Sequence, residues 1–286
     1  MRNAGPAAGS GRAVARERGG MTAPVVVKLG GRALEAPGAT RDLASEVARA
    51  RGPLVLVHGG GAEVSAWCER LGLAPRFVEG LRVTDAATLE VAAAVLAGLA
   101  NKRLVALLRA AGADAVGLSA LDGGLVEAGL HPDAARLGEV GHIQAVDPAL
   151  LETLLAQGRL PVLASIGSLG GRLLNLNADD LAAAIAGALG ARALVLLSDA
   201  PGVKIAGTPV PRVPAGELEA MLAHPEVQGG MRPKLGAAGA ALAAGVPRVH
   251  IAAWSGPGTL DRLLAGTDGV PGTTLTAGTP VEAARG

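Results

Sequence analysis

The stretch Val25-Val26-Val27-Lys28-Leu29-Gly30-Gly31 decides the fold, together with its counterpart Leu54-Val55-Leu56-Val57-His58-Gly59-Gly60-Gly61. Each is a short apolar run that ends in a glycine turn, and a charged segment with helical periodicity lies between them at 41–51. Short apolar strands that alternate with helices indicate βαβ units. The pattern therefore predicts an α/β protein with a parallel central sheet.

The same alternation continues almost to the end of the chain. It predicts further strands at 115–118, 161–166, 193–198 and 248–252. Ala and Leu at i, i+3 and i+4 predict helices at 62–71, 86–111, 147–157, 179–190 and 232–244. The irregular part, 119–146, predicts a β-flap over a site, with short strands around 124–128 and 140–145. A hairpin tip is expected at 168–171, and a soft boundary near 172 divides an N-terminal lobe, 21–172, from a C-terminal lobe, 173–286.

Composition narrows the classes of ligand and compartment. The 286 residues include 26 basic and 25 acidic side chains, so no charge excess points to nucleic acid or to an anionic membrane. The apolar stretches are interrupted before the ~20 residues that span a bilayer, so no transmembrane helix is expected. Cys68 is the only cysteine, which excludes an intrachain disulfide and fits the cytoplasm. Residues 1–20 are expected to be a disordered extension, and Met21 is an alternative start.

The two glycine turns are candidates for anion binding. Gly-Gly after a strand is more often an ordinary turn, but Lys28 is costly to bury in an apolar strand without an anionic partner. The run Gly59-Gly60-Gly61 opens a helix and forms an anion nest. It matches neither the P-loop nor the dinucleotide fingerprint. His58 fits a structural role as well as a catalytic one.

Three further segments supply countercharges. Arg82, flanked by apolar residues, suits a carboxylate, although a solvated loop arginine is equally compatible. The run Asn175-Leu-Asn-Ala-Asp179 precedes a helix, and a helix cap explains only one of its polar side chains. Lys234 lies in the first turn of a helix, where the macrodipole disfavours a cation unless an anion binds nearby. Residues 198–203 end a strand and could surround a nucleotide, although taken alone they fit a plain strand-to-loop turn better.

In this order, these residues resemble the amino acid kinase family, and within it the N-acetylglutamate kinases. The similarity runs from about Val25 to about Thr274. It rests on seven motifs: Lys28-Leu-Gly-Gly, His58-Gly-Gly-Gly, Gly80-Leu-Arg-Val-Thr, Asn101-Lys102, Asn175-Leu-Asn-Ala-Asp179, Leu197-Ser-Asp-Ala-Pro-Gly and Gly230-Met-Arg-Pro-Lys234. The resemblance implies an open αβα sandwich with a mainly parallel sheet, whose N-terminal lobe holds the acceptor and whose C-terminal lobe holds ATP.

The resemblance also implies residue roles. Lys28 and Lys234 would stabilise the transferring phosphoryl group, and Asp179 would orient both lysines. Gly60, Gly61, Arg82 and Asn175 would bind the acceptor, with Arg82 on its α-carboxylate. The nucleotide would contact Gly30, Gly31, Asp199, Ala200, Pro201, Gly202, Val203, Lys204, Glu226, Val227 and Gln228. No protein side chain is expected to be a dedicated metal ligand, so Mg²⁺ would arrive bound to ATP.

The implied reaction transfers the γ-phosphoryl group of ATP to the γ-carboxylate of N-acetyl-L-glutamate, giving N-acetyl-L-glutamyl 5-phosphate in the second step of arginine biosynthesis. The motif Gly98-Leu-Ala-Asn-Lys102 implies the homodimeric, arginine-insensitive type. Where relatives often have Ser-Gly-Lys-Asp-Gly, this chain reads Ser119-Ala-Leu-Asp-Gly123, which leaves the acceptor less defined than the fold. A kinase for carrier-bound aminoadipate or glutamate is the alternative, and a non-catalytic amino acid sensor is a further one.

Overall fold

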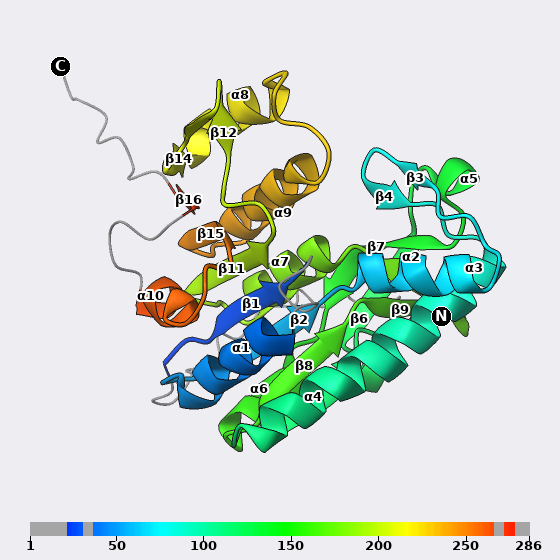
Figure 1. Ribbon diagram of the computed structural model, residues 1–286, viewed down its shortest axis with the longest axis horizontal. Coiled ribbons are helices and arrows are strands. Elements are labelled where there is room, and N and C mark those ends of the chain that lie inside the picture. Colours follow the sequence, from blue (N-terminus) through cyan, green and yellow to red (C-terminus); the bar gives the residue numbers. More distant parts are fainter. Residues whose placement is uncertain (1–21, 31–36, 266–271, 278–286) are drawn as a thin grey trace, which may run out of the picture.

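The computed structural model describes residues 22–30, 37–265 and 272–277. Within these residues, eight strands form one sheet in the order β14-β16-β15-β11-β1-β2-β8-β5. Their pairings are parallel except that of β15 with β16. The strands are β1 (Val25–Leu29), β2 (Leu54–His58), β5 (Ala115–Ser119), β8 (Leu160–Ala164), β11 (Ala193–Ser198), β14 (Arg212–Pro214), β15 (Arg248–Ala253) and β16 (Thr273–Thr276). The predicted mainly parallel sheet is confirmed (Figure 1).

Strand β1 lies in the middle of this sheet and divides its side chains between the two faces. Val25, Val27 and Leu29 belong to one hydrophobic cluster, whereas Val26 belongs to the other. Successive side chains of a strand point to opposite faces, so Lys28 shares the face of Val26. This alternation directs the lysine toward helix α7 (Ala178–Ala188), which contacts β1 on that face.

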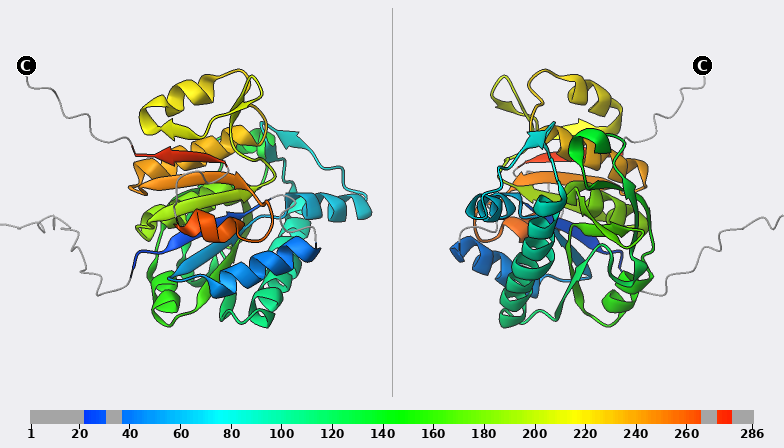
Figure 2. Two further views of the ribbon diagram at one scale, coloured as in Figure 1. Left: turned by 60° about the vertical axis from the view of Figure 1, so that its left-hand side comes forward. Right: turned by 90° about the vertical axis from the view of Figure 1, so that its right-hand side faces the viewer.

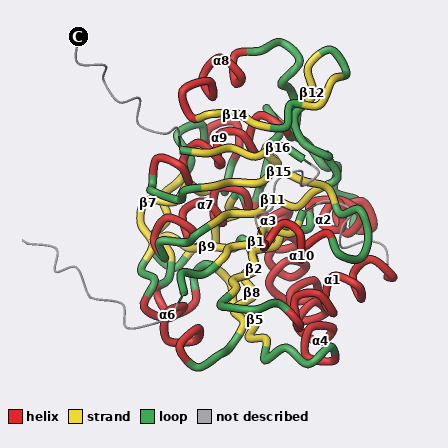
Figure 3. The backbone as a smooth tube through the Cα atoms, turned by 90° about the vertical axis from the view of Figure 1, so that its left-hand side faces the viewer, coloured by secondary structure: helices red, strands yellow, loops and turns green. Residues whose placement is uncertain are grey.

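Helices cover both faces of the sheet, as the side views show (Figures 2 and 3). Helices α1 (Pro37–Arg49), α4 (Asn101–Ala110) and α10 (Thr259–Ala265) supply Leu43, Leu104 and Leu260 to the cluster with Val25. Helices α6 (Ala149–Ala156), α7 and α9 (Met231–Ala243) supply Leu151, Leu181 and Leu235 to the cluster with Val26. The αβα layering implied by the resemblance is therefore present.

A second, four-stranded sheet forms the predicted flap and the strands after it. Its order is β6-β7-β10-β9, with bounds β6 (Val126–Leu130), β7 (Val140–Val146), β9 (Ile166–Leu169) and β10 (Arg172–Leu176). Strands β9 and β10 pair antiparallel, and the tip expected at 168–171 is a shorter turn at 170–171 between them. The strand predicted at 161–166 is in fact two, β8 and β9, which belong to different sheets.

The predicted helix 86–111 is present as a continuous helical stretch, with α3 (Ala86–Ala93), a π-helical segment at Ala94–Ala100 and then α4. By length and composition this stretch, Ala86–Ala110, would pass as a membrane span, with a mean hydropathy of 1.7. Core helices of soluble proteins pass the same test. Here α4 packs against β5, β8 and α1, and Asn101 is fully buried within the fold.

Several short elements have no counterpart in the sequence predictions. Two small hairpins occur, β3 (Phe77–Val78) with β4 (Leu81–Arg82) and β12 (Lys204–Ile205) with β13 (Thr208–Pro209). The unpredicted helical elements are α5 (Ala134–Leu137), α8 (Leu218–Ala223) and the 3₁₀ turns Asp122–Gly124 and Ala215–Glu217. Helix α2 (Gly61–Arg70), in contrast, was expected at 62–71. Two-residue strands carry too little periodicity to be recognised from sequence. The extension 1–20 lies outside the described residues.

Candidate active site

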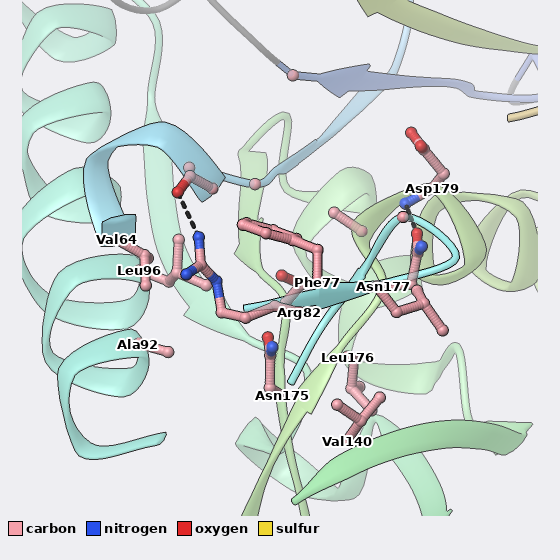
Figure 4. A pocket seen from close by; sticks show the side chains of 18 of the residues that line it. Val64, Phe77, Arg82, Ala92, Leu96, Val140, Asn175, Leu176, Asn177 and Asp179 are labelled. Carbon is pink, nitrogen blue, oxygen red and sulfur yellow. Dashed lines mark hydrogen bonds between the residues drawn. The ribbon is translucent and has the colours of Figure 1, made fainter. Parts of the chain in front are cut away.

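The carboxyl ends of β1 and β2 lie side by side and carry the two glycine turns. In their parallel register Leu29 is paired with His58, so Gly30 and Gly59 follow at the same edge of the sheet. A cavity of about 230 Å³ begins there. It is lined by both turns, by the β3–β4 hairpin, by Val64 and Leu96, and by residues 175–179 (Figure 4). Ligands of open α/β sheets bind at this edge.

Three charged side chains meet beside the cavity. Lys28 Nζ lies 2.8 Å from Asp179 Oδ1, and Lys234 Nζ lies 2.9 Å from Asp179 Oδ2. Asp179 is in the first turn of α7, whose N-cap Asn177 accepts hydrogen bonds from the Asp179 and Asp180 N–H groups. Lys234 comes from the first turn of α9. The predicted pairing of both lysines with one carboxylate is therefore seen in the geometry.

Burial makes this arrangement electrostatically unusual, because Lys28 is only 7% exposed and Asp179 only 5%. Burial raises the pKa of Asp179, but the two lysines outweigh it and hold that pKa below its ordinary value. Burial lowers the pKa of Lys28. The charge of Asp179 opposes this lowering only in part, because Lys234 shares the same carboxylate. Two cations thus face one anion, and the net positive charge favours an additional anion in the cavity.

Gly30 contributes space to this cluster. A methyl group on Gly30 would collide with Lys28 Nζ, so only glycine leaves the ammonium group its position. The Gly30 N–H donates to the Leu197 carbonyl at 2.9 Å and is already engaged. This hydrogen bond holds β1 to β11, so a contact of Gly30 with the nucleotide would have to use other atoms than this N–H. Gly31 lies outside the described residues.

Arg82 on β4 reaches the second glycine turn. Its Nη2 donates to the Gly61 carbonyl at 2.6 Å and to Ser65 Oγ at 2.7 Å. Its Nη1 is buried and has no hydrogen-bond partner among the described residues. The Arg82 Cζ atom lies 4.7 Å from the centroid of the Phe77 ring. Figure 4 shows the two side chains next to each other. A buried guanidinium with one unsatisfied nitrogen at the wall of a cavity is suited to bind a carboxylate.

The remaining acceptor candidates also line the cavity. Gly60 is the N-cap of α2 and Gly61 its first residue, so N–H groups without intrahelical partners begin here. Asn175 Nδ2 donates to Thr84 Oγ1 at 3.0 Å, which connects β10 to the segment after β4. The structure thus brings Gly60, Gly61, Arg82 and Asn175 around one cavity.

His58 is shown to have a structural role by its two contacts. It is fully buried, its Nδ1 lies 2.9 Å from the Gly59 carbonyl oxygen, and its Nε2 lies 3.0 Å from Asn101 Nδ2. The Asn101 amide donates to Nε2, so Nδ1 carries the proton and the ring is neutral. Burial lowers the pKa of His58, which agrees with that state. Both ring nitrogens are occupied, and His58 does not line the cavity.

Residues 23–253 match the model of the amino acid kinase family. The chain belongs to the amino acid kinase family. It is 44% identical over 252 residues to an acetylglutamate kinase of Symbiobacterium thermophilum, covering 82% of this chain and 85% of that protein. It is 47% identical over 230 residues to an acetylglutamate kinase of Methanopyrus kandleri, covering 77% and 91%. A crystal structure from Streptococcus mutans UA159 superposes with a TM-score of 0.75 at 30% identity, covering 89% of this chain and 99% of that one.

Of the residues expected to bind the nucleotide in this amino acid kinase, Gly30 lines the cavity that holds Arg82, whereas residues 199–204 and 226–228 do not line it. Asp199, Ala200, Pro201 and Gly202 follow β11, and Glu226 and Gln228 lie between α8 and α9. Asp199 is near enough to Lys28 to oppose the lowering of the lysine pKa. Glu226 accepts a hydrogen bond from the Ala206 N–H at 2.8 Å. Lys204 is exposed on β12, and contact of all these residues with ATP stays a prediction.

Two members of this set are core residues. The side chains of Val203 and Val227 are 1% and 3% exposed and pack in the cluster with Val26. The Val203 N–H donates to Thr273 Oγ1 at 2.8 Å. Neither the side chains nor this N–H can reach a ligand, so any contact with ATP would be through other backbone atoms.

Sequence reasoning missed two residues that contact Arg82. Phe77 lies across from Arg82 in the β3–β4 register, and Ser65 is one helical turn after Gly61. Phe77 is the only phenylalanine of the chain, and this rarity was the one sequence feature that could have marked it as a site residue. Among the described residues, no three or more His, Cys, Asp and Glu side chains are grouped so that they could hold a metal ion.

Proposed function

We propose that this kinase transfers the γ-phosphoryl group of ATP to the γ-carboxylate of N-acetyl-L-glutamate, in arginine biosynthesis. The observation that carries the proposal is the joint placement of Lys28, Asp179 and Lys234 beside a cavity that also holds the buried Nη1 of Arg82. Relatives named acetylglutamate kinase match most of the chain. The charges at the two ends of the cavity fit an acceptor with two carboxylates.

The acceptor carboxylates are assigned by charge. The α-carboxylate would accept from Arg82 Nη1, while Nη2 keeps its bonds to Gly61 and Ser65. The γ-carboxylate would then lie toward Lys28 and the N–H groups at the start of α2. Its usual pKa is about 4.3, so it is ionised at neutral pH and no general base is required. Asn175 would contact the amide region of the acceptor.

The transfer would proceed directly between the two substrates. An oxygen of the γ-carboxylate forms a bond to the γ-phosphorus, the bond from that phosphorus to the bridging oxygen of ATP breaks, and ADP leaves with the electron pair. Phosphoryl transfer depends mainly on positioning and on neutralisation of charge. Lys28 would neutralise charge on the acceptor side and Lys234 on the nucleotide side, and Asp179 would hold both ammonium groups in place.

The residues that the structure describes do not form a dedicated magnesium site. Both oxygens of Asp179 are occupied by lysines, and the described residues offer no other cluster of ligands. Magnesium keeps several waters and is usually held by substrate phosphates. We therefore propose that Mg²⁺ enters with ATP.

Two features support a homodimer. Strand β5 is the last strand of the main sheet and pairs only with β8 within the described residues, which leaves an edge. Beside it, the outer face of the Ala86–Ala110 stretch exposes Leu99 at 42%. Sedimentation equilibrium tests this: Leu99→Glu should give a monomer, whereas Leu71→Glu, a change at an exposed leucine directly after α2, should not. A monomeric wild type would exclude the dimer.

We also propose a cytoplasmic location, with which the free, buried thiol of Cys68 is compatible.

The test of the reaction is formation of acyl phosphate, trapped with hydroxylamine. The purified protein is offered ATP, Mg²⁺ and, one at a time, N-acetylglutamate, glutamate, N-acetylaminoadipate and aspartate. Turnover on N-acetylglutamate alone is expected. Turnover that requires a carrier-bound aminoadipate or glutamate would instead support the alternative kinase, and ATP binding without turnover on any acceptor would support a sensor.

A further inference from the structure

The turn of the β3–β4 hairpin lies against the start of α9. Glu79 and Gly80 form the two-residue turn, with φ of 51° and 86°, as a type I′ hairpin requires at both positions. A methyl group built on Gly80 would lie 3.5 Å from Pro233 Cγ and 3.6 Å from the Gly229 carbonyl oxygen, both ordinary contact distances. The turn therefore faces Pro233 with room for about one methyl group.

This approach joins two parts of the site that are far apart in the sequence. On one side, Gly80 is two residues from Arg82, whose buried Nη1 has no hydrogen-bond partner among the described residues. On the other side, Pro233 immediately precedes Lys234, which pairs with Asp179. A displacement of the hairpin thus moves both the acceptor-binding arginine and the surface on which the first turn of α9 rests.

Both halves of the contact are stiff. The hairpin is held at its base, since the Thr84 N–H donates to the Leu137 carbonyl at 2.8 Å and Thr84 Oγ1 accepts from Asn175. Proline has a fixed φ, so the first turn of α9 cannot absorb a push at Pro233 by rotating there. Contact at the ring would therefore be transmitted to the adjacent Lys234.

We propose that Pro233 is a positioning residue, through which acceptor bound at Arg82 draws the β3–β4 turn onto α9 and fixes Lys234 for the nucleotide. The inference rests on the proposed function, because it takes N-acetylglutamate as the acceptor. Acceptor and ATP then bind with positive coupling, and each raises the affinity for the other by the same factor.

The experiment measures this coupling by calorimetry. The affinity for a non-hydrolysable ATP analogue with Mg²⁺ is determined without and with saturating N-acetylglutamate, and kcat is measured in parallel. We expect the acceptor to raise nucleotide affinity by about 5-fold or more in the wild type, within the usual range of couplings. In Pro233→Ala the factor should fall to about 1–2, with lower kcat, while each ligand alone binds as in the wild type.

Two variants separate the contact from a general effect on folding. Pro233→Val restores γ-carbons without the ring and should recover coupling lost in Pro233→Ala. Pro148→Ala changes a proline at the start of α6, away from the cavity, and should leave the coupling unchanged. Unaltered coupling in Pro233→Ala, equal loss in the alanine and valine variants, or no coupling in the wild type would each overturn the proposal.

Failure of the underlying function would give a different result. A wild type that neither binds nor phosphorylates N-acetylglutamate removes the premise and the inference together. If the wild type phosphorylates N-acetylglutamate normally and the Pro233→Ala variant keeps full coupling, only the proposed role of Pro233 is contradicted.

Discussion

Asp179 holds Lys28 at 2.8 Å on one carboxylate oxygen, and the other oxygen is taken by a second lysine at 2.9 Å. Lys28 lies on β1 and Asp179 on α7. These elements are adjacent in the fold, although the two residues are 151 positions apart in the sequence. The carboxylate is nearly fully buried. Removal of its charge should therefore affect both catalysis and stability.

Asp179→Asn keeps the size of the side chain but leaves two buried ammonium groups facing each other. We expect kcat to fall by about 10²–10³-fold and the free energy of unfolding to fall by about 3 kcal/mol. Steady-state kinetics and urea unfolding measure the two effects. Asp42→Asn, at an exposed position of α1, is the control and should change either quantity little. Wild-type turnover in Asp179→Asn would contradict the assigned role.

Lys234→Met should lower kcat by orders of magnitude and leave folding intact, because Lys28 still pairs with Asp179. Circular dichroism and acyl phosphate formation test the two parts. Arg109→Met removes a positive charge at an exposed ion pair with Asp114 and should retain turnover. If Lys234→Met turned over at near the wild-type rate, the phosphoryl group would not depend on this lysine.

Arg82→Ala should raise the KM for the acceptor far more than the KM for ATP, because its Nη1 has no hydrogen-bond partner among the described residues and lies at the cavity proposed for the acceptor. Separate titrations of the two substrates give both constants. An equal rise in both would mean that Arg82 does not bind the acceptor.

Phe77→Leu tests the ring that lies over Arg82. The ring is 55% exposed, so its cation–π contact is expected to contribute about 0.5–1 kcal/mol. The acceptor KM should rise by about 2–5-fold with kcat unchanged. Leu71→Ala, which truncates another exposed apolar side chain, provides the comparison and should have no effect. An unchanged acceptor KM in Phe77→Leu would show that the ring does not support Arg82.

The pH dependence follows from the lowered pKa of Lys28. The proposed mechanism uses Lys28 as a cation, and burial lowers the pKa of this lysine from 10.5, so activity should be lost as the pH rises to values still below 10.5. Asp179, with a pKa below 3.8, stays ionised throughout. The profile of kcat/KM for ATP from about pH 6 to about pH 10.5 measures this. A profile without an alkaline decline in that range would contradict the expectation.

Much of the fold could be predicted because hydrophobic periodicity reports burial. The strand Val25–Leu29 is confirmed at the predicted residues, and so is the strand Ala193–Ser198. The small hairpins escaped prediction because a two-residue strand such as Phe77–Val78 depends on its turn and its contacts rather than on a repeating pattern.

At the site, the sequence left two questions open that contacts decide. His58 could have been catalytic or structural, and the amide of Asn101, 43 positions away, identifies it as structural. The Gly30 N–H looked available to a phosphate, but β11 uses it. In both cases the deciding partner is distant in the chain, so no local pattern could reveal it.

The sequence by itself therefore determined the α/β class and the central strands, and it identified the residues proposed to neutralise a phosphoryl group, because side-chain chemistry and periodicity are local properties. Only the tertiary structure decided that Lys28 and Lys234 share the carboxylate of Asp179, that Phe77 covers Arg82, and that Gly80 faces Pro233. Such contacts depend on how the sheet and its helices pack, and packing is set by the whole chain at once.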